Sequence, residues 1–235
     1  MNEEELMKEA RRTAETAGLK LLDQEEGLVL TDGTLELTAD FARDLHRVKR
    51  GNLQRELLVR AAKIKRNPEP EKGAGDKALT AVDATAGFGE DSLLLAAAGF
   101  SVTLFELNPV IAALLQDALR RAGEIPELKD AAGRMKMICG DSVTQLPLLS
   151  FRPDIILLDP MFPERTKSAL VKKKFQLLHL LEQPCADEEA LLEAAGRAGA
   201  SRIIIKRPLK GPYLAHRKPS YSLEGKTIRY DVIVC

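Results

Sequence analysis

The tetrapeptide Asp159-Pro160-Met161-Phe162 places a carboxylate, a rigid ring and an aromatic side chain directly after an apolar run. The run, residues 155–158, is short and branched, which is typical of a buried strand. A carboxylate and a carbonyl beside a proline can accept both N–H bonds of a planar amino group, while the aromatic ring stacks on the attached base. Asp-Pro also begins turns, so the meaning of this segment depends on a second element upstream.

That second element is a glycine-containing turn. Residues 79–91 predict a strand that runs into a turn with Gly87 and Gly89 and then into a helix, and glycine lets a backbone approach a ligand closely. The next predicted strand ends on Glu106, whose carboxylate can accept hydrogen bonds from a ribose diol. The pattern fits a dinucleotide or S-adenosylmethionine. Ser92 fills the third glycine position of G-x-G-x-x-G, which disfavours a nicotinamide cofactor.

A further acid, Asp141, follows the apolar run 135–139, and we expect it at the same edge of the sheet. An acid or hydroxyl there can meet an adenine amino group, although Asp141 is equally suited to capping a helix. Methyl transfer to an exocyclic amine requires alignment and desolvation of the amine and the later loss of a proton. We expect Asp159 to orient the amine and accept that proton, beside Pro160. Phe162 is expected to stack on the base, although core packing explains an isolated phenylalanine equally well.

Strands and helices alternate after residue 79, which predicts a parallel sheet covered on both faces. The expected strands are 80–84, 101–106, 135–139, 154–158 and 201–206, and the expected helices are 90–98, 109–122, 165–182 and 187–198. A last strand at 227–234 is expected to be antiparallel. In the usual doubly wound order the strand before Asp159 lies beside the first strand, which puts Asp159 at the ligand-binding crevice.

The first third of the chain has a different character. Residues 3–16 predict a polar helix, and residues 28–37 alternate around Asp32-Gly33, which indicates a hairpin. A basic stretch follows, with helical apolar spacing from Asn52, and then a Pro- and Gly-containing linker. We therefore predict an N-terminal α+β extension, residues 1–75, and a main domain, residues 76–235.

Composition limits the partners. Lys and Arg together number 35, as do Asp and Glu, so a nucleic-acid partner requires a local concentration of cations. Phosphate contact competes with a solvated helix face for Lys172 and Lys173, and is favoured for Lys206 and Arg207, at a predicted strand end. Three isolated cysteines form neither a disulfide framework nor a metal-ligand pattern. No signal peptide or membrane span is evident, so we expect a soluble, cytoplasmic protein.

Together these residues resemble the bacterial methyltransferase family that modifies the N2 amine of one guanine in 16S ribosomal RNA. The resemblance rests on residues 82–89, 106–109, 158–163, 167–173 and 205–208, and extends from about residue 42 to the C-terminus. Its most specific part is Asp-Pro-Met-Phe-Pro followed by Lys-Ser-Ala-Leu-Val-Lys-Lys.

The resemblance implies an α/β fold, a Rossmann-like doubly wound methyltransferase sheet, and S-adenosylmethionine as cofactor. It places the cofactor positions on Glu90, Asp91, Glu106, Leu107, Asp141, Ser142 and Asp159, beside Asp83, Gly87 and Gly89 of the strand and turn. The family's turn usually reads Gly-Leu-Gly-Arg-Asp, so Glu90 replaces an arginine. With 16S ribosomal RNA or the small ribosomal subunit as partner, the predicted RNA contacts are Lys167, Lys172, Lys173, Lys206 and Arg207, and no metal is expected.

Other hypotheses stay open. The acid-proline-aromatic segment also suits an amino group of DNA, another RNA or a protein glutamine. A non-catalytic RNA-binding module with a vestigial cofactor pocket is a further possibility, against which the intact Asp83, Glu106 and Asp159 argue. A nicotinamide dehydrogenase would lack the third glycine and an evident catalytic His or Tyr.

Overall fold

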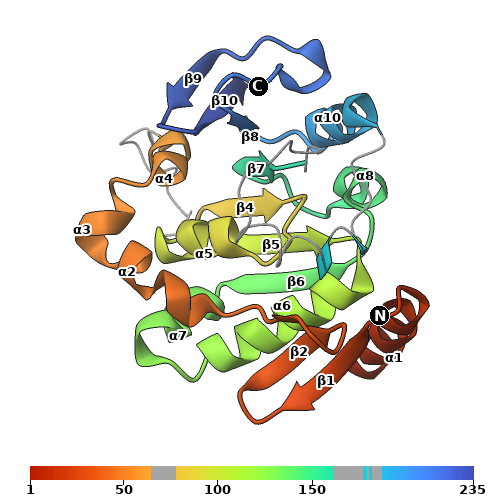
Figure 1. Cartoon of the computed structure of the whole chain (residues 1–235). Helices are drawn as coiled ribbons and strands as arrows, with labels where there is room; N and C mark the ends of the chain where they lie inside the picture. The colour runs from red at the N-terminus through yellow and green to blue at the C-terminus, as the bar shows by residue number, and fades with distance from the viewer. Residues whose placement is uncertain (65–77, 161–176, 179, 182–186) are drawn as a thin grey trace.

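The computed structural model describes residues 1–64, 78–160, 177–178, 180–181 and 187–235 (Figure 1). A three-stranded sheet has the order β1-β2-β3, and a seven-stranded sheet has the order β6-β5-β4-β7-β8-β10-β9. The small sheet lies near one end of the large one, and β9 and β10 form the opposite end (Figure 1).

The large sheet is mostly parallel, as predicted. Its strands are β4 (Thr80–Asp83), β5 (Ser101–Glu106), β6 (Met135–Cys139), β7 (Ile155–Leu158), β8 (Arg202–Pro208), β9 (Tyr221–Glu224) and β10 (Ile228–Val234). Strands β4 to β8 pair in parallel, whereas β10 is antiparallel to β8 and β9 is antiparallel to β10. Strand β9 was not predicted, because this edge strand is mainly exposed and carries no clear apolar alternation.

Alternate residues of the central strands pack into two separate cores. Ala81, Ile155 and Leu157 belong to one core, while Val82 and Ile156 belong to the other. Side chains of a strand alternate between the faces of a sheet, so both faces of this sheet are covered. The prediction of a sheet buried on both faces is therefore confirmed.

The helices divide between these cores. The first core holds α1 (Glu3–Thr16), α5 (Glu90–Ala97), α6 (Pro109–Ala122) and α7 (Pro126–Ala132), and the second holds α8 (Ser142–Gln145), η2 (Leu146–Leu148), α10 (Glu188–Arg197) and η3 (Leu214–His216). Of the predicted helices, 90–98, 109–122 and 187–198 are confirmed within a residue, whereas 165–182 lies almost entirely outside the described residues. Helix α7 was not predicted.

The N-terminal extension packs against α6 (Figure 1). Leu6, Ala10 and Ala14 form a buried stripe along α1 at helical spacing. Strands β1 (Lys20–Gln24), β2 (Gly27–Thr31) and β3 (Glu36–Leu37) are antiparallel, which confirms the hairpin around Asp32-Gly33. Asp117 of α6 accepts a hydrogen bond from the backbone N–H of Leu28, at 3.0 Å. The extension and the large sheet thus share one apolar core.

The basic stretch forms short helices rather than one long helix. They are η1 (Phe41–Asp44), α2 (Leu45–Val48), α3 (Arg50–Leu53) and α4 (Leu57–Ala61). The apolar spacing predicted a helix from Asn52 onward, but the helical backbone is interrupted between α3 and α4. Because α4 contacts α5, β9 and β10, this segment runs along the side of the sheet that carries α5 (Figure 1).

Candidate active site

The predicted site residues gather where the parallel strands end. Asp83 ends β4, Glu106 ends β5, and Asp159 follows β7 directly. Asp141 follows β6 after one glycine. The carboxyl ends of parallel strands form one edge of a sheet, which is where ligands bind in doubly wound folds.

Glu106 holds the glycine turn in place. Its Oε2 accepts a hydrogen bond from the N–H of Gly87 at 2.9 Å, and its Oε1 accepts one from the N–H of Asn108 at 2.8 Å. Asn108 in turn caps α6, with Pro109 as the first helical residue. The predicted ribose acid therefore also fixes the turn that precedes α5.

The two glycines of the turn have left-handed backbones, with φ of +54° at Gly87 and +74° at Gly89. A Cβ on Gly89 would lie 2.8 Å from Cδ1 of Leu115, whereas a Cβ on Gly87 would meet no atom of the described residues within 4 Å. Gly89 thus permits close packing of α6 against the turn. Gly87 faces open space, as a backbone that a ligand approaches must.

Asp83 is buried beneath this turn. Its Oδ2 accepts the Ser92 hydroxyl at 2.6 Å, and its Oδ1 accepts the N–H of Thr85 at 3.1 Å. Burial raises the pKa of Asp83 to about 7, against the lowering effect of these hydrogen bonds. Ser92, which stands at the third glycine position of a dinucleotide motif, therefore supports the turn from below.

The part of the site where we expect the adenine contains a helix-capping acid, Asp141, and an apolar side chain, Leu107. Asp141 caps α8 by accepting the N–H of Val143 at 2.9 Å, so the helix-cap interpretation of Asp141 is confirmed. Ser142 is buried, whereas Leu107 exposes 63 % of its surface. An exposed leucine directly after the ribose acid offers an apolar face to a planar ring.

Asp159 is fixed through both its backbone and its side chain. Its N–H donates to Oγ1 of Thr85 at 2.6 Å, and its Oδ2 lies 2.8 Å from Nζ of Lys206. Pro160 is buried, while the Asp159 side chain is 37 % exposed and accessible to a ligand. Phe162, Lys167, Lys172 and Lys173 lie outside the described residues.

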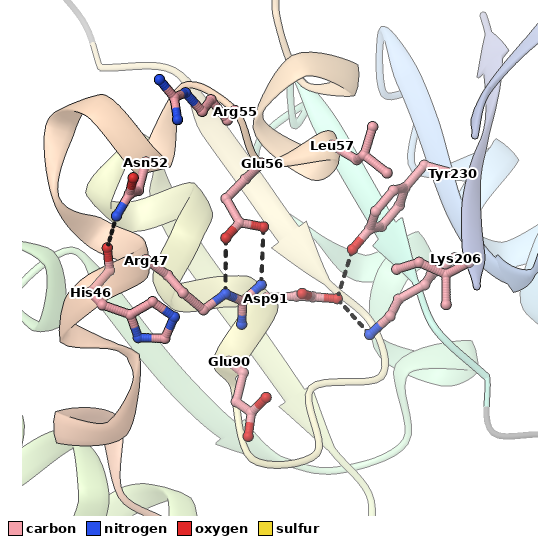
Figure 2. A pocket seen from close by; sticks show the side chains of 11 residues that line it. His46, Arg47, Asn52, Arg55, Glu56, Leu57, Glu90, Asp91, Lys206 and Tyr230 are labelled. Carbon is pink, nitrogen blue, oxygen red and sulfur yellow. Dashed lines mark hydrogen bonds and ion pairs between the residues drawn. The ribbon is translucent and has the colours of Figure 1, made fainter. Parts of the chain in front are cut away.

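Lys206 also contacts Asp91, the second residue of α5. Its Nζ donates to Oδ2 of Asp91 at 2.9 Å, and the Tyr230 hydroxyl donates to the same oxygen at 3.3 Å (Figure 2). The ammonium is thus occupied by two carboxylates. This position does not support the prediction that Lys206 contacts RNA phosphate.

Arg207 requires a correction as well. The residue is only 1 % exposed, because its side chain points to the face of the sheet opposite Lys206 and is covered there. The guanidinium donates to the carbonyl of Pro212 at 2.8 Å and pairs with Glu188 at 3.4 Å. Arg207 therefore ties β8 to α10 and to the loop after β8, and cannot reach a phosphate from this position.

A cavity of about 540 Å³ opens beside Lys206 and Asp91. The N-terminal extension forms much of its wall, which comprises His46, Arg47, Asn52, Arg55, Glu56, Leu57, Glu90, Asp91, Lys206, Ile228 and Tyr230 (Figure 2). Arg47 spans the wall and donates to both oxygens of Glu56, at 3.0 and 3.2 Å. Burial raises the pKa of Glu90, which lines the same cavity.

Sequence reasoning did not assign Arg47, Arg55 or Tyr230 to the site. No local signal marks Arg47, on α2, or Arg55, between α3 and α4, because they reach the cavity only when α2 and α4 pack against α5. The position of Tyr230 near the site could have been predicted from the sequence. It sits on the predicted antiparallel last strand, and its register partner on β8 is Lys206.

S-adenosylmethionine fits these residues by their chemistry. Open space beside Gly87, a carboxylate at Glu106 and an exposed Leu107 match a close backbone approach, a ribose and a planar base, respectively. Among the residues that the structure describes, no group of three or more His, Cys, Asp or Glu side chains could hold a metal ion. Nor does any helix in the described ranges have the length and apolarity to cross a membrane.

Comparison with known proteins identifies the family. Residues 5–235 match the family described as "Putative SAM-dependent methyltransferase". "Ribosomal RNA small subunit methyltransferase J" of Pseudomonas aeruginosa is 38 % identical over 240 residues, covering 95 % of this chain and 88 % of the relative. The protein of the same name from Aeromonas salmonicida is 43 % identical over 190 residues, covering 80 % of this chain and 73 % of the relative.

A solved structure supports the same assignment. The SAM-dependent methyltransferase NGO1261 from Neisseria gonorrhoeae superposes with a TM-score of 0.70 and 32 % identity, covering 92 % of this chain and 83 % of that protein. Its similarity extends over the fold that brings the glycine turn, Glu106 and Asp159 to one edge of the sheet. The chain belongs to the family of S-adenosylmethionine-dependent methyltransferases.

Proposed function

We propose that this enzyme transfers a methyl group from S-adenosylmethionine to the exocyclic N2 amine of a guanine in 16S ribosomal RNA, in the cytoplasm. The observation that carries the proposal is Asp159, a partly exposed carboxylate fixed beside the glycine turn. The names of the relatives support ribosomal RNA of the small subunit as the substrate. The resemblance of residues 158–163 and 167–173 supports guanine N2 as the acceptor.

S-adenosylmethionine supplies a methyl group on a sulfonium sulfur. Glu106, Leu107, Asp141 and Ser142 are the proposed contacts to its nucleoside, with the backbone of Gly87 approaching it closely. Asp83, Gly89, Glu90 and Asp91 shape the turn and the start of α5 beside it. We assign no side-chain contact to Glu90, which replaces the family's usual arginine.

Asp159 has two proposed tasks. Its carboxylate accepts an N–H bond from the amine, which aligns the nitrogen for in-line attack and increases electron density on it. When the new N–C bond has formed, the nitrogen carries an extra proton, which Asp159 accepts. Phe162 is proposed to stack on the guanine, next to Pro160.

RNA binding needs exposed cations that are not already paired. Five such side chains, which we call the basic surface, come from the end of the N-terminal extension: Lys49, Arg50, Arg55, Arg60 and Lys63. No ion pair joins them to an acid within the described parts of the chain, and Arg55 lines the cavity beside the site. We propose that they contact phosphates, together with Lys167, Lys172 and Lys173.

The test is transfer of a labelled methyl group by the purified enzyme. We expect incorporation into 16S ribosomal RNA from cells that lack the gene, and digestion of that RNA should give N2-methylguanosine as the labelled nucleoside. Free RNA and assembled small subunits are assayed in parallel, because either is a plausible form of the substrate. Label on another nucleoside, or on DNA or protein instead of RNA, would reject the guanine assignment.

A further inference from the structure

Lys206 occupies an unusual position, with its ammonium between two acids of the site. Nζ lies 2.8 Å from Oδ2 of Asp159 and 2.9 Å from Oδ2 of Asp91. The Tyr230 hydroxyl binds the same Asp91 oxygen from the other side. Figure 2 shows Asp91 as the shared acceptor of Lys206 and Tyr230.

The register of the sheet explains why these groups meet. Leu157 pairs with Ile204, so Asp159 and Lys206, each two residues later, emerge side by side on the same face. Lys206 pairs directly with Tyr230 on β10. Asp91 lies in the first turn of α5, which packs on that face. The cluster is thus fixed by three strands and one helix.

Two carboxylates at this distance from one ammonium would repel each other in its absence. Burial raises the pKa of Asp159, and the positive charge of Lys206 is the largest opposing effect. Burial also works to lower the pKa of Lys206, but Asp91 and Asp159 outweigh it and hold that pKa above its ordinary value. Lys206, in direct contact with Asp159, therefore does most to keep this carboxyl ionised, with a smaller electrostatic contribution from Arg207.

The remaining charged or titratable groups around the cluster come from every neighbouring element. They are Asp83 on β4, Glu90 on α5 and Arg207 on β8, together with four groups of the N-terminal extension that line the cavity beside Lys206: His46, Arg47, Arg55 and Glu56. Asp83 and Asp91 add negative charge, whereas Arg207 lies on the opposite face of its strand and binds Glu188. None of them replaces Lys206 as a direct partner of Asp159.

We propose that Lys206 is a positioning residue, which keeps Asp159 ionised and oriented toward the substrate amine. This inference rests on the proposed role of Asp159 in amine methylation. An ionised Asp159 can accept the hydrogen bond from the amine N–H and then accept the proton. A protonated Asp159 would present an O–H donor, so it would be a weaker acceptor of that hydrogen bond and a poor acceptor of the proton. Asp91, held by Tyr230, anchors the other side of the ammonium.

The direct test is the pH dependence of kcat for Lys206→Met, at saturating S-adenosylmethionine and RNA. In the wild-type enzyme kcat should fall with decreasing pH as Asp159 becomes protonated. Without the ammonium this fall should move to higher pH by about one unit or more, and kcat near neutral pH should drop at least about tenfold. Lys206→Arg, which keeps the charge, should restore most of the loss.

Lys210→Met is the matched control, because Lys210 is exposed and lies just beyond β8. It should leave kcat and the pH profile unchanged. Thermal unfolding of each variant shows whether it folds. If Lys206→Met does not fold, Asp91→Asn provides the test. In that variant Asp159 is the only carboxylate paired with Lys206, so Asp159 should stay ionised to lower pH and the fall in kcat should move to lower pH.

The inference fails if Lys206→Met, or Asp91→Asn in its place, shows the wild-type pH profile. A normal kcat with weaker, less salt-dependent RNA binding in Lys206→Met would instead support phosphate contact. These outcomes differ from failure of the proposed function, which would appear as wild-type enzyme that does not methylate 16S ribosomal RNA.

Discussion

At the scale of single residues, the two acids proposed to recognise the nucleoside, Glu106 and Asp141, also accept hydrogen bonds from backbone N–H groups. Glu106 accepts two, from Gly87 and Asn108, and Asp141 accepts one from Val143. A carboxylate held in this way loses little conformational entropy when a ligand binds. The same acids that would recognise the nucleoside are thus already oriented for it.

Glu106→Ala should weaken binding of S-adenosylmethionine by about tenfold or more, because the ribose acceptor and the anchor of the glycine turn are both lost. Titration calorimetry measures the change. Glu124→Ala is the control, because Glu124 is an exposed acid just beyond α6 with a single surface ion pair. Equal affinities for Glu106→Ala and the wild type would remove Glu106 from the cofactor site.

At the scale of elements, neighbouring side chains pack against only one of the two glycines in the turn between β4 and α5, among the residues that the structure describes. Gly89 is packed against Leu115 of α6 and Phe41 of η1, whereas Gly87 has room for a Cβ among the residues that the structure describes. Both have left-handed backbones, so an alanine is strained at either position. Gly89 therefore allows the helices to pack closely, and Gly87 allows a ligand to approach the backbone.

Gly89→Ala should destabilise the fold by about 2–4 kcal/mol, since a left-handed backbone and a steric overlap combine. Gly87→Ala should cost only about 1–2 kcal/mol but should weaken S-adenosylmethionine binding. Denaturant unfolding and calorimetry measure the two effects. If the two variants lost equal stability and Gly87→Ala bound the cofactor normally, this division of roles would be wrong.

A buried ion pair within β10 orients an arginine near the start of this strand, which binds the end of β8. Arg229 pairs with Asp231 at 2.9 Å and donates to the carbonyls of Pro208 and Leu209, with the Arg229 and Asp231 side chains 6 % and 3 % exposed. Arg229→Met should cost about 3–5 kcal/mol, because Asp231 would remain as a buried unpaired charge. Adding Asp231→Asn to Arg229→Met should recover part of the lost stability, which urea unfolding measures. If the double variant recovered no stability, the buried unpaired charge would not be the cause of the loss.

Sequence was most informative where function depends on neighbours along the chain. The glycine turn, Glu106 and the Asp159-Pro160 step are each local, and the alternation of β4 to β8 predicted that they share an edge. Lys206 and Arg207 received one predicted role, phosphate contact, but a strand sends adjacent side chains to opposite faces and Arg207 is buried. Only the pairing with β7 and β10 reveals that one meets Asp159 and the other is buried near α10.

At the scale of the whole molecule, the N-terminal extension forms part of the site. It shares the core of the large sheet, and its short helices bring Arg47 and Arg55 to the cavity beside Asp91. The sequence predicted its hairpin and basic character, but no local pattern could tell where this segment packs. In a chain of zero net charge, the basic surface concentrates cations next to the site.

The double variant Arg55→Gln and Arg60→Gln should bind RNA more weakly. The slope of its log affinity against log salt concentration should be smaller by up to about 2 units. Filter binding over a range of salt concentrations measures both. The control is the double glutamine variant of Lys8 and Lys20, which are exposed on α1 and β1. If both double variants kept the wild-type slope, RNA would have to contact another surface.

The central claim is that Asp159 enables methylation of one guanine amine in 16S ribosomal RNA. The most direct measurement is mass mapping of that RNA from cells without the gene, complemented with the wild-type or the Asp159→Asn gene. The account predicts that one N2-methylguanosine disappears, that the wild-type gene restores it, and that Asp159→Asn, expressed at an equal level, does not. An unchanged methylation map, or full restoration by Asp159→Asn, would contradict it.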